Sequence, residues 1–164
     1  KTMQTRQFGF FESNKVVHLT TDGSGYVLAA GVTDPNSGSV DRLGFERVAF
    51  LVTLGDDADT GSIIAKVEHS DDDSSFAAVD DVDGNDVAVT VTDASNSSDH
   101  DMIGIEVYGG KLKRYVRLNF TRATANTAIN ALHAFLSNAH DTPVTQLTTT
   151  SQFNAAPITK EVVA

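Results

Sequence analysis

The stretch FERVAFLVTL, residues 45–54, alternates between two sets of side chains and indicates the class of fold. One set of alternate positions is wholly apolar and comprises Val48, Phe50, Val52 and Leu54. The other set begins at Arg47 and ends at Thr53. Because successive side chains of a strand point to opposite faces, this period of two predicts a half-buried β-strand.

The same alternation recurs along the chain. Residues 63–67, 87–92, 103–107 and 116–120 each place an apolar residue at every second position. The chain holds 18 Val and 18 Thr but only 5 Glu and 6 Lys, a composition typical of strands. Gly109 and Gly110, between the last two stretches, predict a hairpin turn. We therefore expect an all-β protein, an antiparallel β-sandwich or jelly roll with extended N- and C-terminal arms.

The distribution of turn residues suggests three regions. Residues 1–40 are broken by Gly and Pro and are predicted to form an N-terminal arm with short strands. Residues 41–140 are predicted to form the β-sandwich core, and residues 141–164 a C-terminal tail. Residues 128–136 fit the apolar spacing of either a helix or a strand, and their length does not decide between them.

Composition excludes several classes of function. The formal net charge of −10 opposes binding to the phosphates of nucleic acids or to an anionic membrane surface. No run of apolar residues is long enough to span a membrane, and the N-terminal residues lack the apolar core of a secretory signal. With no Cys, thiol catalysis and thiolate metal sites are excluded. We expect a soluble, unexported protein without nucleic-acid or membrane partners.

Charge is segregated along the sequence. Residues 56–101 contain 14 acidic residues and one basic residue, whereas residues 102–122 contain five basic residues and one acidic residue. One interpretation is that a basic strand pair meets an acidic surface of another subunit. The alternative is that Asp fills turns and that Lys and Arg line a solvated strand face.

Neither a metal site nor a catalytic group follows from the sequence. Residues 81–86 resemble the start of a calcium loop, but Gly84 is fourth instead of sixth and the twelfth residue is Thr92. The five His residues are scattered, and no nucleophile elbow of the Gly-x-Ser-x-Gly type occurs. His69 and His133 are expected to be core or interface residues. We predict a protein that is not an enzyme and has no cofactor and no metal.

Three stretches carry a resemblance to a known family: residues 43–52, residues 65–76 and residues 113–117, which read LGFERVAFLV, AKVEHSDDDSSF and KRYVR. Together they resemble small head-associated structural proteins of tailed bacteriophages. These proteins share the same order of a strand, a hairpin with an acidic turn, and a basic strand. The resemblance covers roughly residues 43–122.

The resemblance implies a capsid decoration protein, also called a cement protein. Such a protein is a non-enzymatic virion structural protein that binds the outer surface of the major capsid shell and stabilises the bacteriophage head. It implies the major capsid protein as partner, a homotrimer as the oligomeric state, and assembly on the capsid exterior in the host cytoplasm. The alternative is a carbohydrate-binding or adhesion module on a virion or cell surface.

Seven residues are candidates for contact with a partner. The arm and tail carry apolar side chains that a sandwich has no evident room to cover, namely Phe8, Phe10, Phe11, Val162 and Val163. In the basic stretch, Arg117 and Arg122 are the further candidates. Arg114 and Arg117 are three residues apart, so they should lie on opposite faces of a strand, with one of them directed at a carboxylate.

Overall fold

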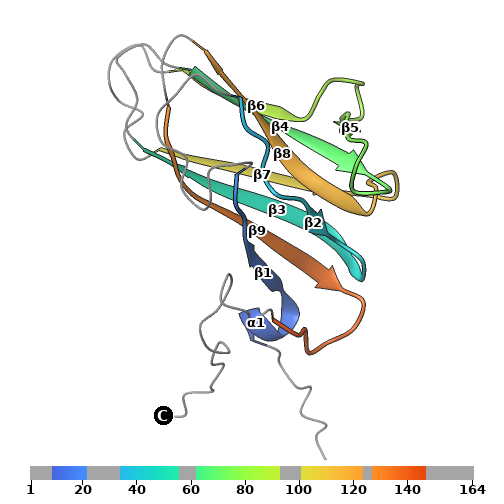
Figure 1. The fold of residues 1–164 in the computed structure, drawn as a ribbon. Helices are drawn as coiled ribbons and strands as arrows, with labels where there is room; N and C mark the ends of the chain where they lie inside the picture. The colour runs from blue at the N-terminus through green and yellow to red at the C-terminus, as the bar shows by residue number, and fades with distance from the viewer. Residues whose placement is uncertain (1–8, 22–33, 56–61, 93–100, 124–126, 147–164) are drawn as a thin grey trace, which may run out of the picture.

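Two antiparallel sheets pack face to face in the computed structural model, which describes residues 9–21, 34–55, 62–92, 101–123 and 127–146 (Figure 1). The chain is an all-β antiparallel sandwich, as the alternating sequence predicted. In the described residues the one helix is α1 (Phe10–Ser13), which is four residues long. No helix of the described residues is long and apolar enough to cross a membrane.

The first sheet, here the β3 sheet, has four strands. In spatial order they are β1 (Lys15–His18), β9 (Ile129–Ala139), β3 (Phe45–Leu54) and β7 (Met102–Tyr108). The central strand β3 pairs along most of its length with both β9 and β7. This sheet therefore joins the start, the middle and the end of the described chain.

The second sheet, here the β4 sheet, lies opposite. Its strands are β2 (Val40–Asp41), β8 (Tyr115–Ala123), β4 (Ser62–Ser70), β5 (Ala77–Ala78) and β6 (Ala88–Thr92). Strand β4 pairs with β8 on one side and with both β5 and β6 on the other. The acidic stretch 71–73 forms the turn between β4 and β5, in line with the interpretation that Asp fills turns.

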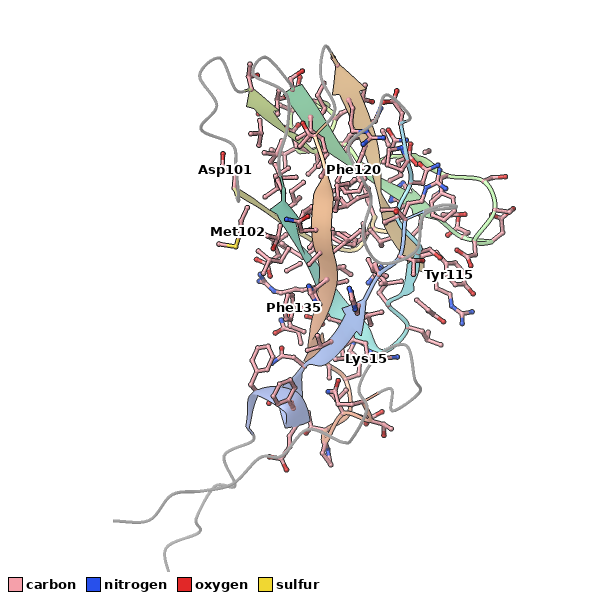
Figure 2. All side chains as sticks on the ribbon, turned by 60° about the vertical axis from the view of Figure 1, so that its left-hand side comes forward. Lys15, Asp101, Met102, Tyr115, Phe120 and Phe135 are labelled. Carbon is pink, nitrogen blue, oxygen red and sulfur yellow. The ribbon has the colours of Figure 1, made fainter. Side chains whose placement is uncertain are left out.

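The core lies between the sheets and is built from the apolar sets of the predicted strands. Val48, Phe50, Val52 and Leu54 of β3 are at most 2% exposed. They face the buried apolar residues of the opposite sheet, among them Ile63, Val67, Val116, Leu118 and Phe120. Figure 2 shows Phe120 lying in this interior. Each fully buried side chain of this size contributes about 1.5–3 kcal/mol relative to exposure.

The hairpin predicted at Gly109 and Gly110 is wrong. Strand β7 belongs to the β3 sheet and β8 to the β4 sheet, so the connection crosses the sandwich. A turn does form, because the Leu112 N–H donates to the Gly109 carbonyl at 3.1 Å and Gly109 has a φ of 122°. Leu112 is 6% exposed, so its burial draws this connection across the end of the core.

The stretch 128–136, which fitted either a helix or a strand, lies in β9 from Ile129 onward. Strand β9 pairs with β3 on one side and β1 on the other, which only an extended chain can do. Leu132, Ala134 and Leu136 are fully buried and alternate with half-buried residues. Two neighbouring strands, distant in sequence, decide a conformation that local spacing left open.

Parts of the predicted arm and tail meet at one end of the β3 sheet. Helix α1 leads directly into β1, the edge strand of this sheet. The side chain of Gln146 donates to the carbonyls of Phe11 and Asn14, and its Oε1 accepts from the Val16 N–H. Residue 40, the expected end of the arm, begins β2. The division of the chain at residues 40 and 140 stays a prediction.

Candidate functional site

The outer surfaces of the two sheets differ in chemistry, and the surface of the β3 sheet is the less polar. We call it the apolar face; its central residues are Ala49, Leu51, Gly104, Ala131, His133 and Phe135. Met102 and Tyr108, at the β7 edge of this face, are each 66% exposed. Figure 2 shows Met102 projecting away from the sandwich. A contiguous apolar surface of this kind marks a site of interaction with another molecule.

Two predicted contact residues lie at one end of the apolar face. Phe10 is 54% exposed, and its ring centroid lies 6.2 Å from that of Phe135 in an edge-to-face arrangement. Phe11 packs edge-on against Phe10 with ring centroids 5.2 Å apart. Helix α1 therefore extends the apolar face beyond β9 with aromatic side chains.

A pair of histidines crosses the same face. His18 of β1 and His133 of β9 are directly opposite in register, and their rings stack with centroids 4.6 Å apart and an angle of 15°. Burial lowers the pKa of both side chains, and the neighbouring His18 lowers that of His133 further. Both rings are therefore neutral at pH 7, which keeps this part of the face uncharged.

Charged side chains on the apolar face are confined to its margin. Arg47 and Glu106 form an ion pair with 3.5 Å between Nη1 and Oε1, and the Arg47 guanidinium lies 4.4 Å from the centre of the Tyr108 ring. Both charges are substantially exposed, so their interaction is weak. The centre of the face is left without a charge.

The outer surface of the β4 sheet is polar by comparison. Arg117 of β8 binds Glu68 of β4 through Nε at 2.8 Å and Nη2 at 2.7 Å, and its guanidinium lies 4.0 Å from the centre of the Phe76 ring. Lys66 and Asp86 form a second ion pair at 3.4 Å. The charges on this surface are therefore largely paired within the chain.

The two predicted basic contact residues, Arg117 and Arg122, differ in how far their side chains are buried. Arg117 lies on the outer surface of the β4 sheet, half-buried in its ion pair. Arg122 is 7% exposed and its Nη1 donates to the Thr127 carbonyl at 3.0 Å, which leaves little of its side chain for a partner. Phe8, Val162 and Val163 lie outside the described residues.

Arg114 and Arg117 were expected to differ, with one directed at a carboxylate. Both are: Arg114 makes a two-point contact with Asp41, at 3.0 Å from Nε and 2.6 Å from Nη2. This contact lowers the pKa of Asp41 and raises that of Arg114. Two carboxylates are therefore bound where one was expected. Arg114 precedes β8, so the alternation of that strand does not fix the direction of its side chain.

Hydrogen bonds within the acidic turns account for the Asp residues found there, because the carboxylates accept from backbone N–H groups of the same turn. The Asp72 carboxylate accepts from the N–H groups of Ser74 and Ser75, and these bonds, with one from the Ser70 hydroxyl, hold its pKa well below the usual range. Asp81 accepts from Asp83 and Asn85 in the next turn. In the described residues no three carboxylates or imidazoles gather as a metal site would require.

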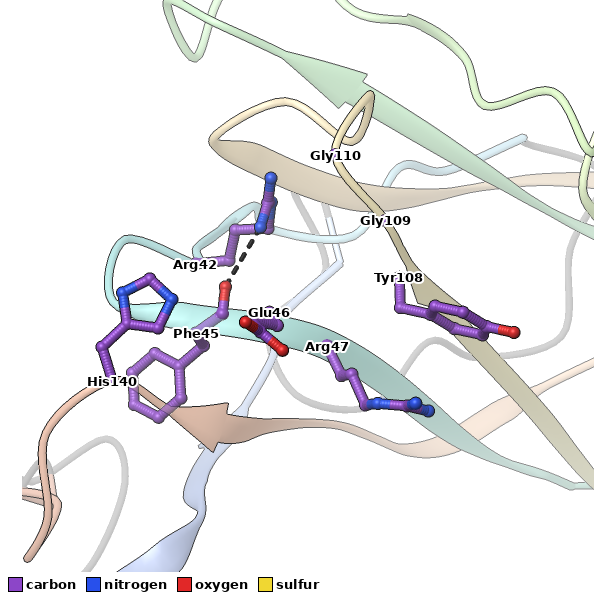
Figure 3. A pocket seen from close by; sticks show the side chains of 8 residues that line it. All are labelled: Arg42, Phe45, Glu46, Arg47, Tyr108, Gly109, Gly110 and His140. Carbon is purple, nitrogen blue, oxygen red and sulfur yellow. Dashed lines mark hydrogen bonds between the residues drawn. The ribbon is translucent and has the colours of Figure 1, made fainter.

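A shallow pocket of about 370 Å³ lies at one end of the β3 sheet (Figure 3). It is lined by Arg42, Phe45, Glu46, Arg47, Tyr108, Gly109, Gly110 and His140. The Arg42 guanidinium donates to the carbonyls of Leu112, Lys113 and Phe45, so it serves the fold of the loops. The pocket combines an exposed aromatic ring with a few polar groups.

Sequence reasoning missed the apolar face and the histidine pair. The first had a visible signal, because Ala49 and Leu51 occupy the outward positions of the stretch 45–54, where a solvated face would carry polar residues. The second had none, because His18 and His133 lie on strands that are far apart in the sequence.

Comparisons with known proteins give distant likenesses in structure alone. No protein-family profile and no curated protein matches the sequence. The Eiger TNF of S. frugiperda aligns with a TM-score of 0.35 at 9% identity, over 83% of this chain and 100% of that one. The xylan-binding module CBM15 aligns with a TM-score of 0.32 at 13% identity, over 79% and 94%. Function is therefore argued from the chain's own surfaces.

Proposed function

We propose that this chain is a non-enzymatic virion structural protein that binds the outer surface of a major capsid shell and stabilises it. The resemblance of residues 43–52, 65–76 and 113–117 to head-associated phage proteins names the partner. The apolar face is the observation that carries the proposal, because it supplies a surface for docking on another protein. The position on the capsid exterior belongs to the same proposal, and a homotrimer is the oligomeric state that the resemblance implies.

The size of the apolar face suits a protein partner. The four strands have 4, 11, 10 and 7 residues, and at about 3.3 Å per residue and about 4.8 Å between strands they span roughly 500 Å². A standard protein interface takes about 800 Å² from each partner, so the β3 sheet supplies more than half of this area before the adjoining aromatic residues of α1 are added. The centres of protein interfaces are depleted in charge, as the centre of this face is.

The acidic turns support an orientation on the shell. The turns at residues 71–73 and 80–86 belong to the β4 sheet, on the side opposite the apolar face. With the apolar face against the shell, these carboxylates would point to solvent. Their charge would keep decorated particles hydrated and mutually repelling.

The test is to mix the purified chain with undecorated heads and to measure bound copies by co-sedimentation and by added density in electron micrographs. Leu51→Arg puts a charge at the centre of the apolar face. Ile64→Arg is the matched control, since Ile64 is also half-buried and outward-facing, but on the β4 sheet.

We expect the wild type and Ile64→Arg to saturate the heads and Leu51→Arg to bind at least tenfold more weakly, with all three equally folded by circular dichroism. Failure of the wild type to bind would overturn the proposed function. Equal binding by Leu51→Arg would remove the apolar face from it.

A carbohydrate-binding or adhesion module is the second candidate, favoured by the pocket at Tyr108. An exposed aromatic ring beside Glu46, Arg47 and His140 offers a stacking surface and hydrogen-bonding groups, which sugar sites combine. Binding of soluble polysaccharides, measured by calorimetry and lost in Tyr108→Ala, would support this function. Equal heats with and without the ring would exclude this pocket.

A further inference from the structure

Strand β7 forms an open edge of the β3 sheet. It pairs with β3 and with no other strand of the described residues, and it is seven residues long. The opposite edge of the same sheet is β1, which has four residues and adjoins α1. Strand β7 is therefore the longer edge of this sheet, and its contacts outside the sheet are with β6 of the opposite sheet.

The hydrogen-bond register shows which backbone groups face outward. The Leu54 N–H donates to the Asp101 carbonyl at 2.8 Å, and Thr53 is directly opposite Met102. In an antiparallel pair, hydrogen-bonded and non-hydrogen-bonded positions alternate. The N–H and C=O groups of four residues therefore point away from β3, namely those of Met102, Gly104, Glu106 and Tyr108.

Strand β7 has few of the features that prevent an exposed edge strand from pairing with a strand of another chain. Natural edges are short, or contain Pro, Lys or a bulge. The sequence of β7 is MIGIEVY, which has none of these residues and a single charge, Glu106. Its pairing with β3 runs without a register shift. An edge with these properties is a template for another strand.

We propose that β7 pairs with β7 of a second copy of this chain, antiparallel, about a two-fold axis at Ile105, which makes a dimer in place of the homotrimer that the resemblance implies. This register places Met102 opposite Tyr108 and Gly104 opposite Glu106, each twice. All seven residues overlap, and every outward N–H and C=O group meets a partner. The two β3 sheets become one sheet of eight strands, with both apolar faces on the same side.

Other registers with the outward groups aligned are poorer. An axis at Glu106 sets the two carboxylates directly opposite each other, which destabilises a strand pair. An axis at Gly104 pairs only five residues of each β7. The register at Ile105 combines full overlap with a charge that faces a glycine. The strand is thus self-complementary, and this is the argument for a second copy as the occupant of the edge.

Gly104 gives a test that depends on the sign of a charge. A Cβ built at Gly104 meets nothing within 4 Å, and its φ is not positive, so both Gly104→Glu and Gly104→Lys should fold. In the paired copies, residue 104 faces Glu106 twice. We expect Gly104→Glu to raise the dissociation constant of the dimer about 2- to 30-fold and Gly104→Lys to lower it by a similar factor.

The dissociation constant is measured on the full chain by sedimentation velocity over a range of concentrations. Thr90→Glu and Thr90→Lys are the controls, since Thr90 is exposed on β6 of the other sheet. Opposite shifts at position 104, both shrinking in high salt, with none at position 90, would support the pairing. Monomer at all concentrations up to the millimolar range, a trimer in place of a dimer, or equal constants for the two Gly104 variants would overturn it.

Cysteine pairing reports the register itself, because the chain has no cysteine of its own. Directly opposite, hydrogen-bonded residues have Cα atoms about 5.5 Å apart, within the range a disulfide spans. Mixing Gly104→Cys with Glu106→Cys under mild oxidation should give a covalent dimer of one copy of each. Disulfides formed equally by either variant alone would refute the axis at Ile105.

Discussion

The ion pair between Arg117 and Glu68 should contribute to stability beyond what surface pairs usually do. The Arg117 side chain is 23% exposed and that of Glu68 14%. Two bonds, from Nε at 2.8 Å and from Nη2 at 2.7 Å, reach the same carboxylate oxygen, and the guanidinium covers the Phe76 ring at 4.0 Å. Arg117→Ala removes all three contacts and leaves a mostly buried carboxylate behind.

The magnitude follows from these contacts. A hydrogen bond to a charged group contributes about 1.5–3 kcal/mol, and a cation over an aromatic ring about 0.5–1 kcal/mol at a partly exposed site. Since both partners retain some contact with water, we expect Arg117→Ala to lower the free energy of unfolding by about 2–3 kcal/mol. For a chain of this size, the melting temperature falls by about 4–12 °C.

The assay is urea unfolding of Arg117→Ala, Glu68→Ala and the double variant, compared as a double-mutant cycle. Glu68→Ala should cost less, because the long Arg117 side chain can turn its charge into water. We expect a coupling energy of about 1–2 kcal/mol. Arg114→Ala is the control, since its pair with Asp41 is far more exposed and should change stability less.

A coupling energy below about 0.3 kcal/mol, or a loss in Arg117→Ala no larger than in Arg114→Ala, would refute the reasoning. The pair would then be an ordinary solvated contact. The result also bears on Arg117 as a predicted contact residue. If its charge is needed for stability, weaker binding of a charge-reversed variant to heads says nothing about docking until its folding is measured.

Three further predictions concern pH, metal and a turn. Because burial lowers the pKa of His18 and His133 below the ordinary 6.5, the unfolded chain binds more protons than the folded chain just below pH 6.5. The free energy of unfolding should rise with pH up to about 6.5 and then level off, with a smaller slope in His133→Gln; a fall with rising pH would contradict this. Thermal melting with chelator and with calcium should give midpoints within about a degree, whereas one ion bound at 100 times its dissociation constant would add about 2.7 kcal/mol; such a shift would show that the acidic turns 71–73 and 80–86 bind metal. Gly44→Ala should cost about 1 kcal/mol in urea unfolding, because Gly44 has a φ of 87°, and an unchanged midpoint would show that the turn relaxes without strain.

The strands and their buried sides could be predicted from the sequence because alternation is a local property. Val48, Phe50 and Val52 all point inward because residues two apart in a strand lie on the same face. The turn at residues 71–73 was equally predictable, since Asp72 and its neighbouring serines supply hydrogen bonds within a few residues. The resemblance to phage head proteins also rests on such local stretches.

The partners of the strands could not be predicted in this way. Gly109 and Gly110 form a turn, but whether the next strand pairs with β7 or crosses to the other sheet depends on which surface buries Leu112. The conformation of residues 128–136 was open because it depends on β1 and β3, which offer a strand two edges to pair with. The free energy of pairing between distant strands depends on the whole chain, so it cannot be read from a short stretch of sequence.

The sequence by itself determined an all-β chain, its core residues and its acidic turns, since each follows from side-chain period or turn chemistry within a few residues. Only the tertiary structure decided the surfaces on which the proposals rest. It brought His18 against His133, joined α1 to the apolar face, and left the β7 edge open while closing Arg122 inside the sandwich. Which outward-facing residues become neighbours is fixed by strand order and register, and these are set by burial and hydrogen bonding summed over both sheets.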